Sequence, residues 1–90
     1  MPTLHIINKA PDHPRFPACL RALAEDDTLV LIENAVMALV FESLPLPPCY
    51  ALRADVNARA LSESSVTGVK MIGYAGLVVL TETHQRVMNW

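Results

Sequence analysis

The sequence predicts an α/β fold in a single domain, and three observations favour it. Short apolar segments alternate along the chain with stretches whose apolar residues recur at helical spacing. The apolar segments are nearly continuous, which is typical of strands covered on both faces of a parallel sheet. With 90 residues and no internal repeat, the chain is the size of one small domain, residues 1–90.

Four strands are expected, because four runs rich in aliphatic and β-branched residues are bounded by polar or turn-forming residues. They are Thr3–Asn8, Thr28–Ile32, Cys49–Leu52 and Val69–Ile72. The final segment, Gln85–Trp90, forms either a loop or a short edge strand. We therefore expect a mostly parallel sheet of four, possibly five, strands between helices, a three-layer sandwich.

Helices are expected in the intervals between these strands. Pro17 suits a first helical position, Asn34 a helix N-cap, and Asp55 the N-terminal end of a helix dipole. The expected helices are Pro17–Glu25, Ala35–Glu42, Asp55–Leu61 and Tyr74–Thr83. Ser43–Pro48, rich in proline, is expected to be an extended connector, and Ser62–Gly68 a polar loop.

Composition excludes several classes of protein. Hydrophobic residues make up 52% of the chain and charged residues 18%, so intrinsic disorder is excluded. The apolar stretch from Gly73 to Leu80 is far shorter than the roughly 20 residues of a membrane-spanning helix. A net charge of −2 and a pI of about 5.8 lack the basic excess typical of nucleic-acid-binding domains, so no direct nucleic-acid contact is expected.

The start of the chain and its cysteines indicate the compartment. Met1-Pro2-Thr3 has neither the basic start nor the apolar core of a signal peptide, and there are only two cysteines, Cys19 and Cys49. We expect a cytoplasmic protein with free thiols. Because so small a domain cannot bury all of its apolar residues, we also expect an oligomer, and self-association of the chain when it is isolated.

Familiar cofactor and metal sites are poorly supported. The turn after the first strand has no glycine, which argues against a dinucleotide site, and no phosphate-binding loop motif occurs. The possible metal ligands, His5, His13, His84 and the two cysteines, are scattered without the spacing of a zinc site. His5 lies within an expected strand and is interpreted as a hydrogen-bonded interior residue, so no cofactor and no metal are expected.

Cys19 is the candidate catalytic residue. If the helix starts at Pro17, Cys19 lies in its first turn, where free N–H groups and the helix dipole favour a thiolate, and Arg15 and Arg21 add to that effect. The alternative is that Cys19 is a small apolar residue packed beneath the helix. A functional thiol predicts that Cys19→Ser leaves folding nearly intact, whereas a packing role predicts a loss of stability. Cys49 is interpreted as a packing residue.

Several motifs together resemble the TusB/DsrH family over nearly the whole chain. They are LHIINKAP at Leu4–Pro11, the Cys-Leu-Arg of the first helix, LVLIENAV at Leu29–Val36, YALRADVNARAL at Tyr50–Leu61, and the closing Tyr74 and Trp90. The resemblance implies the fold of the DsrEFH proteins, with flavodoxin-like topology. Ala35, Ala60, Gly73 and Leu77 depart from the family pattern, which has glycines at the first two positions and Asp and Phe at the last two. Ala60 would be strained if its backbone were left-handed.

The resemblance implies a role in sulfur relay. It implies a subunit of a heterohexamer with sister TusC/TusD-like (DsrF/DsrE-like) chains, which exchanges sulfur with small sulfur-carrier proteins. The complex passes persulfide sulfur toward 2-thiolation of the tRNA wobble uridine, or, in the Dsr version, serves dissimilatory sulfur oxidation. The best-established sulfur-carrying cysteine belongs to a sister subunit, and Cys19 matches a cysteine of Dsr-type small subunits.

Two hypotheses follow from the resemblance, and a third does not. Cys19 carries sulfur, or the chain is a structural partner that buries apolar surface while a sister chain does the transfer. A small flavodoxin-like ligand binder is the third interpretation, and it rests on fold analogy alone.

Overall fold

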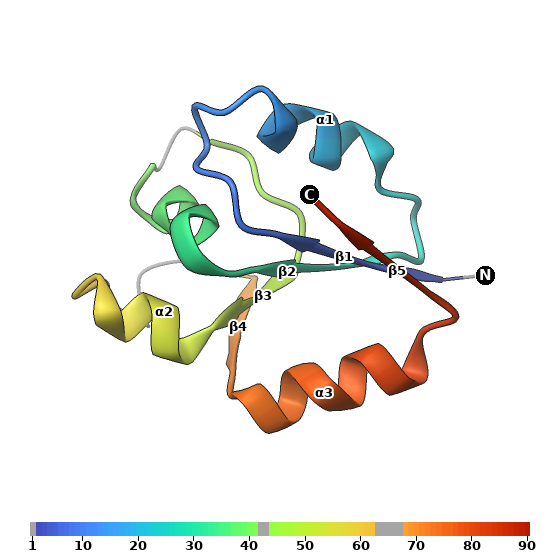
Figure 1. Ribbon diagram of the computed structural model, residues 1–90. Coiled ribbons are helices and arrows are strands. Elements are labelled where there is room, and N and C mark those ends of the chain that lie inside the picture. The colour runs from blue at the N-terminus through green and yellow to red at the C-terminus, as the bar shows by residue number, and fades with distance from the viewer. Residues whose placement is uncertain (1, 42–43, 63–67) are drawn as a thin grey trace.

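The computed structural model describes residues 2–41, 44–62 and 68–90, and it contains a five-stranded sheet in which every paired strand is parallel (Figure 1). The strand order is β4-β3-β2-β1-β5. The strands are β1 (Thr3–Ile7), β2 (Thr28–Leu31), β3 (Cys49–Leu52), β4 (Val69–Ile72) and β5 (Arg86–Asn89). The α/β class expected from the sequence is confirmed, and the C-terminal segment is the edge strand rather than the loop.

The helices occupy the expected intervals, but three of the four begin earlier than expected. They are α1 (Arg15–Ala22), the 3-10 helix η1 (Glu33–Val40), α2 (Arg53–Ala58) and α3 (Tyr74–Thr83). The bounds of α3 are confirmed. The expected end at Glu42 and most of the loop at 63–67 lie outside the described residues.

The second helix differs in type as well as in position. Ile32, not Asn34, is its N-cap residue, and the tighter 3-10 winding stacks residues three apart. Ala35 and Ala38, and Val36 and Leu39, are such pairs, and all four are buried against the sheet. Burial therefore follows a three-residue period, whereas an α-helical period was expected over this segment.

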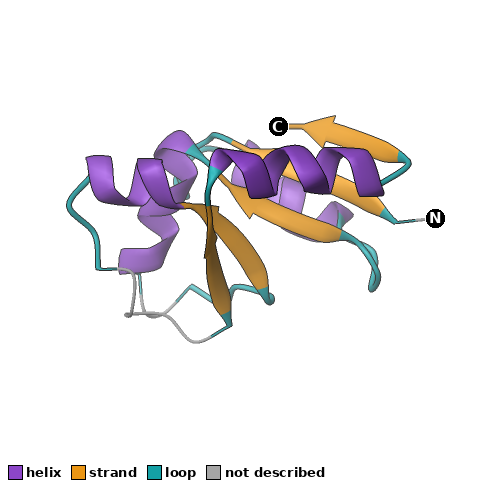
Figure 2. Ribbon diagram, turned by 90° about the horizontal axis from the view of Figure 1, so that it is seen from below, coloured by secondary structure: helices purple, strands orange, loops and turns teal. Residues whose placement is uncertain are grey.

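The two faces of the sheet are covered unequally, because of the strand order. The first three crossovers step in one direction across the sheet, whereas the β4–β5 crossover returns to the far side of β1. Since parallel crossovers are right-handed, the last one places α3 on the opposite face from the other helices. Figure 1 shows α3 on the opposite side of the sheet from α1, and Figure 2 shows it lying alone across that face.

The main core lies on the α1 side of the sheet. Its members come from β1, β2, β3 and the three helices of that face. They are Ile7, Phe16, Cys19, Leu29, Leu31, Ala35, Val36, Ala38, Leu39, Cys49, Ala51 and Val56. None of the described helices is long and apolar enough to cross a membrane.

Candidate functional site

The thiol of Cys19 is sealed inside the protein. Cys19 is 0% exposed and belongs to the main core, and burial raises the pKa of its thiol to about 11. At neutral pH the thiol is therefore protonated. The burial of Cys19 agrees with the packing alternative, and its role as a sulfur carrier stays a prediction.

The cause is the position of α1. The helix begins at Arg15, so Pro17 is its third residue and Cys19 its fifth, beyond the first turn where free N–H groups stabilise an anion. Arg15 and Arg21 are exposed to solvent, whereas the Cys19 side chain faces the core. Local spacing placed Cys19 in a helix correctly but did not show which way its side chain points.

Cys49 packs as expected at the start of β3. It is 6% exposed, and burial raises the pKa of its thiol to about 11 as well. Both cysteines are free. Within residues 2–41, 44–62 and 68–90, no three His, Cys, Asp or Glu side chains are grouped so as to hold a metal ion.

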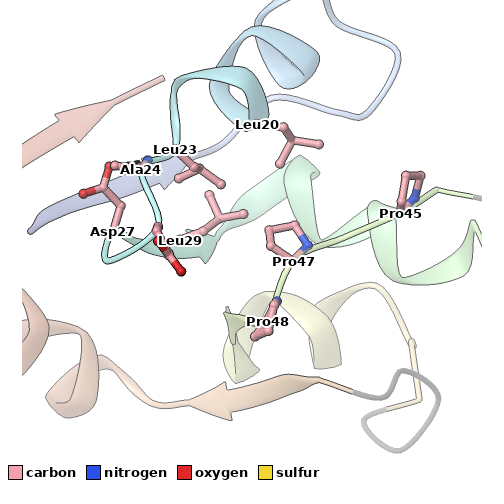
Figure 3. A pocket seen from close by; sticks show the side chains of 9 residues that line it. Leu20, Leu23, Ala24, Asp27, Leu29, Pro45, Pro47 and Pro48 are labelled. Atoms are coloured by element: carbon pink, nitrogen blue, oxygen red, sulfur yellow. Dashed lines mark hydrogen bonds between the residues drawn. The ribbon is translucent and has the colours of Figure 1, made fainter.

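A groove of about 550 Å³ lies at the amino-terminal edge of the sheet. Figure 3 shows leucine side chains of α1 and β2 facing the prolines of the connector across it. The lining residues are Leu20, Leu23, Ala24, Glu25, Asp27, Leu29, Pro45, Pro47 and Pro48. Ligands of open α/β sheets bind at the opposite, carboxyl-terminal edge, and neither cysteine lines this groove. Its lining contains no nucleophile with an adjacent base.

Asp27, in the wall of that groove, is held by three hydrogen bonds. The backbone N–H groups of Thr3 and Ala24 and the His5 ring each donate to its carboxylate over 2.9 Å. The bonds from Ala24, Thr3 and His5, in that order of effect, lower the pKa of Asp27 to about 2. The carboxylate is occupied within the fold and is not available as a catalytic base.

His5 connects Asp27 to Trp90. Its ring is 2% exposed; Nε2 lies 2.9 Å from Asp27 Oδ2, and Nδ1 accepts a hydrogen bond from Trp90 Nε1–H over 3.1 Å. The two rings also stack, with centroids 6.1 Å apart. Because Nδ1 accepts, the ring proton lies on Nε2 and is donated to Asp27. The interpretation of His5 as a hydrogen-bonded interior residue is confirmed.

The carboxyl-terminal edge brings separate sequence motifs together. Lys9 Nζ donates to the backbone oxygen of Trp90 over 3.2 Å. Glu33 N–H donates to Asp55 Oδ2 over 2.7 Å, and Arg59 Nη2 donates to Asn34 Oδ1 over 3.0 Å. These residues all belong to the motifs that carry the family resemblance. They contact one another, which indicates that the motifs maintain the fold at this edge.

Two residues at this edge have left-handed backbone conformations. Glu33 has φ 49° and Ala60 has φ 54°. Ala60 was expected to be strained if its backbone were left-handed. The backbone is left-handed, so the expected strain is present at a position where glycine would have none.

The fold is that of a small α/β domain with a five-stranded parallel sheet. The motif residues at its carboxyl-terminal edge contact other residues of the same chain. Comparison with known proteins is consistent with this class. The sequence matches the family described as "DsrH like protein" over residues 9–87. The chain belongs to this DsrH-like family, which confirms the resemblance to TusB/DsrH proteins.

Individual relatives match the sequence over nearly the whole chain. Protein TusB of Pectobacterium carotovorum is 34% identical, and Protein TusB of Escherichia coli K12 is 36% identical; each match covers 97% of this chain and 99% of the relative. Family membership supports a sulfur-relay subunit that works with other relay subunits.

Solved structures show the same fold. Protein Tm0979 of Thermotoga maritima, solved by NMR in solution, superposes with a TM-score of 0.71 at 29% identity, covering 92% of this chain and 94% of that one. The crystal structure of the ychN protein of E. coli superposes with a TM-score of 0.73 over the whole of both chains, at 20% identity. The latter likeness concerns the fold alone.

The Asp27–His5–Trp90 network and the groove at the amino-terminal edge of the sheet were not predicted from the sequence. The residues of the network are separated by 22 and 85 positions, beyond the reach of any local pattern. The closing tryptophan of the family motif was the one available signal.

Proposed function

We propose that this chain is a structural subunit of a cytoplasmic sulfur-relay complex that passes persulfide sulfur toward 2-thiolation of the tRNA wobble uridine. Family membership and relatives named Protein TusB support the relay. The single observation that carries the structural role is the burial of Cys19 at 0% exposure.

The chemistry of the relay explains why burial matters. A thiolate attacks the outer sulfur of a persulfide, a new sulfur–sulfur bond forms, the old one breaks, and the donor leaves as a thiolate. The exchange consumes no oxidant, but the attacking sulfur must be ionised and reachable. Cys19 is neither in this conformation. A cysteine of a sister TusC/TusD-like subunit is therefore the carrier in this proposal, and this chain supplies surface to the complex and to its docking carrier proteins.

The proposal is tested by complementation of a strain that lacks the gene, with 2-thiouridine in tRNA measured by mass spectrometry. Wild type and Cys19→Ala are expected to restore thiolation equally, because alanine keeps the core site apolar. The control is the empty vector, which restores nothing. If Cys19→Ala fails although immunoblots show normal levels of the chain, Cys19 is a sulfur carrier and the structural role is wrong.

Cys19 as a sulfur carrier stays a prediction with its own test. It requires α1 to move far enough to expose the thiol. The chain is incubated with a persulfide donor, with and without its sister subunits, and its intact mass is measured. One added sulfur atom that maps to Cys19 supports carriage; unmodified Cys19 in the presence of the sister subunits supports the structural role.

Sulfur oxidation is the alternative pathway, favoured by the match to the "DsrH like protein" description and by the presence of Cys19. It predicts that deletion leaves tRNA 2-thiouridine unchanged and slows consumption of reduced sulfur compounds. That pair of results would replace the tRNA assignment and keep the relay role.

A further inference from the structure

The His5 ring lies between two neighbours that favour opposite protonation states. On one side, Asp27 Oδ2 is 2.9 Å from Nε2, and the two side chains are only 2% and 7% exposed. A carboxylate at this distance stabilises a charged imidazolium ring. On the other side, Trp90 Nε1–H donates to Nδ1 over 3.1 Å. An indole nitrogen can only donate, so this second bond exists only while Nδ1 carries no proton.

Protonation of His5 therefore removes the bond to Trp90 and leaves two donors in contact. With a proton on each ring nitrogen, Nε2–H still donates to Asp27, but Nδ1–H points at the indole N–H. The two N–H groups repel each other, and Nδ1–H lacks an acceptor at a ring that is 2% exposed. The neutral ring holds the indole, and the charged ring excludes it from this position.

Asp27 is the only charged group that bonds to the ring among the residues that the structure describes. It is ionised at neutral and mildly acid pH, because its hydrogen bonds lower its pKa to about 2. On α1, the buried Cys19 thiol is protonated and neutral. The remaining charged side chains on the surrounding elements are exposed or half-buried, and solvent screens their charges. They are Lys9 after β1, Arg15 and Arg21 of α1, Glu25 and Asp26 before β2, and Arg86 of β5.

Trp90 is the part of the C-terminal segment that contacts the core. Its side chain packs against the main core, whereas all four residues of β5 are exposed and β5 pairs with β1 alone. We propose that His5 is a pH-dependent latch for β5: the neutral ring holds the Trp90 indole against the core, and protonation of the ring releases it and loosens the strand. Each release takes up one proton from solvent and breaks one hydrogen bond. The latch goes beyond the proposed function, because it operates within a single chain.

His84 lacks this conflict between donors and provides a matched control. Its Nδ1 lies 2.7 Å from Leu80 O, and its Nε2 lies 2.8 Å from Thr28 Oγ1. A hydroxyl group accepts as well as it donates, so Thr28 keeps its bond when His84 gains a proton. Protonation of His84 is therefore expected to leave its neighbours in place.

The first test follows the full chain between about pH 8 and pH 5, the range in which histidine ordinarily gains its proton. Trp90 is the only tryptophan, so one indole N–H signal in NMR and one fluorescence emission report on the latch. In acid, the emission is expected to move to longer wavelength. Exchange of the indole N–H and of the β5 amides, corrected for intrinsic rates, is expected to rise by up to about 10-fold per pH unit, because each opening takes up one proton. The amides of β4, the opposite edge strand, are expected to keep their protection.

The second test uses variants whose folding is checked by circular dichroism. His5→Gln keeps a donor and an acceptor but does not titrate, so its indole exchange is expected to be independent of pH over this range. His84→Gln is expected to show the pH dependence of wild type. Trp90→Phe tests the latch with His5 in place: it removes the opposing donor, so exchange in β5 is expected to be fast throughout the range and no longer to depend on pH.

Three results would overturn the proposal. The first is equal exchange of the wild-type indole N–H at both ends of the pH range. The second is an unchanged pH dependence in His5→Gln or in the β5 amides of Trp90→Phe, which would assign the effect to another group. The third is acceleration of the β4 amides together with those of β5, which would show that acid loosens the whole sheet. None of these measurements involves sister subunits or tRNA thiolation, so the latch and the proposed function fail separately.

Discussion

Ala60 has a backbone conformation that its own side chain disfavours. Its φ of 54° is left-handed, where a Cβ atom costs about 1–2 kcal/mol. The family pattern has glycine at this position. Ala60 therefore adopts a conformation that glycine would adopt without strain.

Ala60→Gly is expected to raise the free energy of unfolding by about 0.5–1 kcal/mol, because relief of strain exceeds the extra entropy of the unfolded chain. Urea denaturation measures it. The control is Ala58→Gly in the last turn of α2, which is expected to lower stability by up to about 1 kcal/mol. Equal destabilisation by both changes would contradict a left-handed Ala60.

The surroundings of Cys19 in the core decide how it tolerates substitution. A serine at this fully buried site places a hydroxyl among apolar side chains, so Cys19→Ser is expected to lower the free energy of unfolding by about 1–3 kcal/mol. This corrects the expectation of nearly intact folding for a functional thiol. Cys19→Ala is expected to cost less, since it only leaves a small void. A serine variant as stable as wild type would mean that the thiol reaches solvent.

At the scale of elements, β5 depends on few contacts. It pairs with β1 alone, and all four of its residues are exposed. Trp90 anchors its end through three bonds: its N–H to Ile6 O over 2.9 Å, its indole N–H to His5, and its backbone oxygen to Lys9. The anchor compensates for an edge strand that buries little apolar surface of its own.

Trp90→Phe tests the anchor. Phenylalanine keeps an aromatic ring but removes the donor to His5 Nδ1, which leaves a buried acceptor unsatisfied at a cost of about 1–3 kcal/mol. Amide hydrogen exchange in β5 is expected to accelerate more than exchange in β4, the opposite edge strand, which serves as the internal control. Uniform acceleration across both edges would show a global effect and no specific anchor.

At the scale of the whole molecule, Asp27 joins segments that the chain order separates. Its carboxylate receives bonds from Thr3 and His5 of β1 and from Ala24, which follows the end of α1. These bonds lower its pKa from 3.8 to about 2, so the folded state favours the ionised form.

The sign of the pH dependence follows from that lowered pKa. Below pH 3.8 the unfolded chain binds a proton that the folded chain does not, so stability is full above this value and is lost as the pH falls toward about 2. Urea midpoints across this range are expected to fall in wild type and to change less in Asp27→Asn. Asp26→Asn, at the exposed neighbour, should follow wild type. An unchanged slope in Asp27→Asn would show that another carboxylate governs acid stability.

Secondary structure was predictable where local chemistry decides it. Aliphatic runs bounded by polar residues located four strands, two of them to the residue, and helical spacing located α3 to the residue. Helix starts were less predictable, because proline is tolerated at any position of the first turn of a helix. Pro17 was expected to be the first residue of its helix, but it is the third residue of α1.

Residue order alone therefore decided the α/β class, the alternation of elements and the family, since these depend on periodicity and on short motifs. Tertiary structure decided the burial of Cys19, the contact between motifs at the carboxyl-terminal edge and the exposure of α3. Each of these depends on which way a helix is turned, or on which face a crossover places it. The right-handed return from β4 to β5 is what isolates α3, and no local pattern in Tyr74–Thr83 specifies that placement.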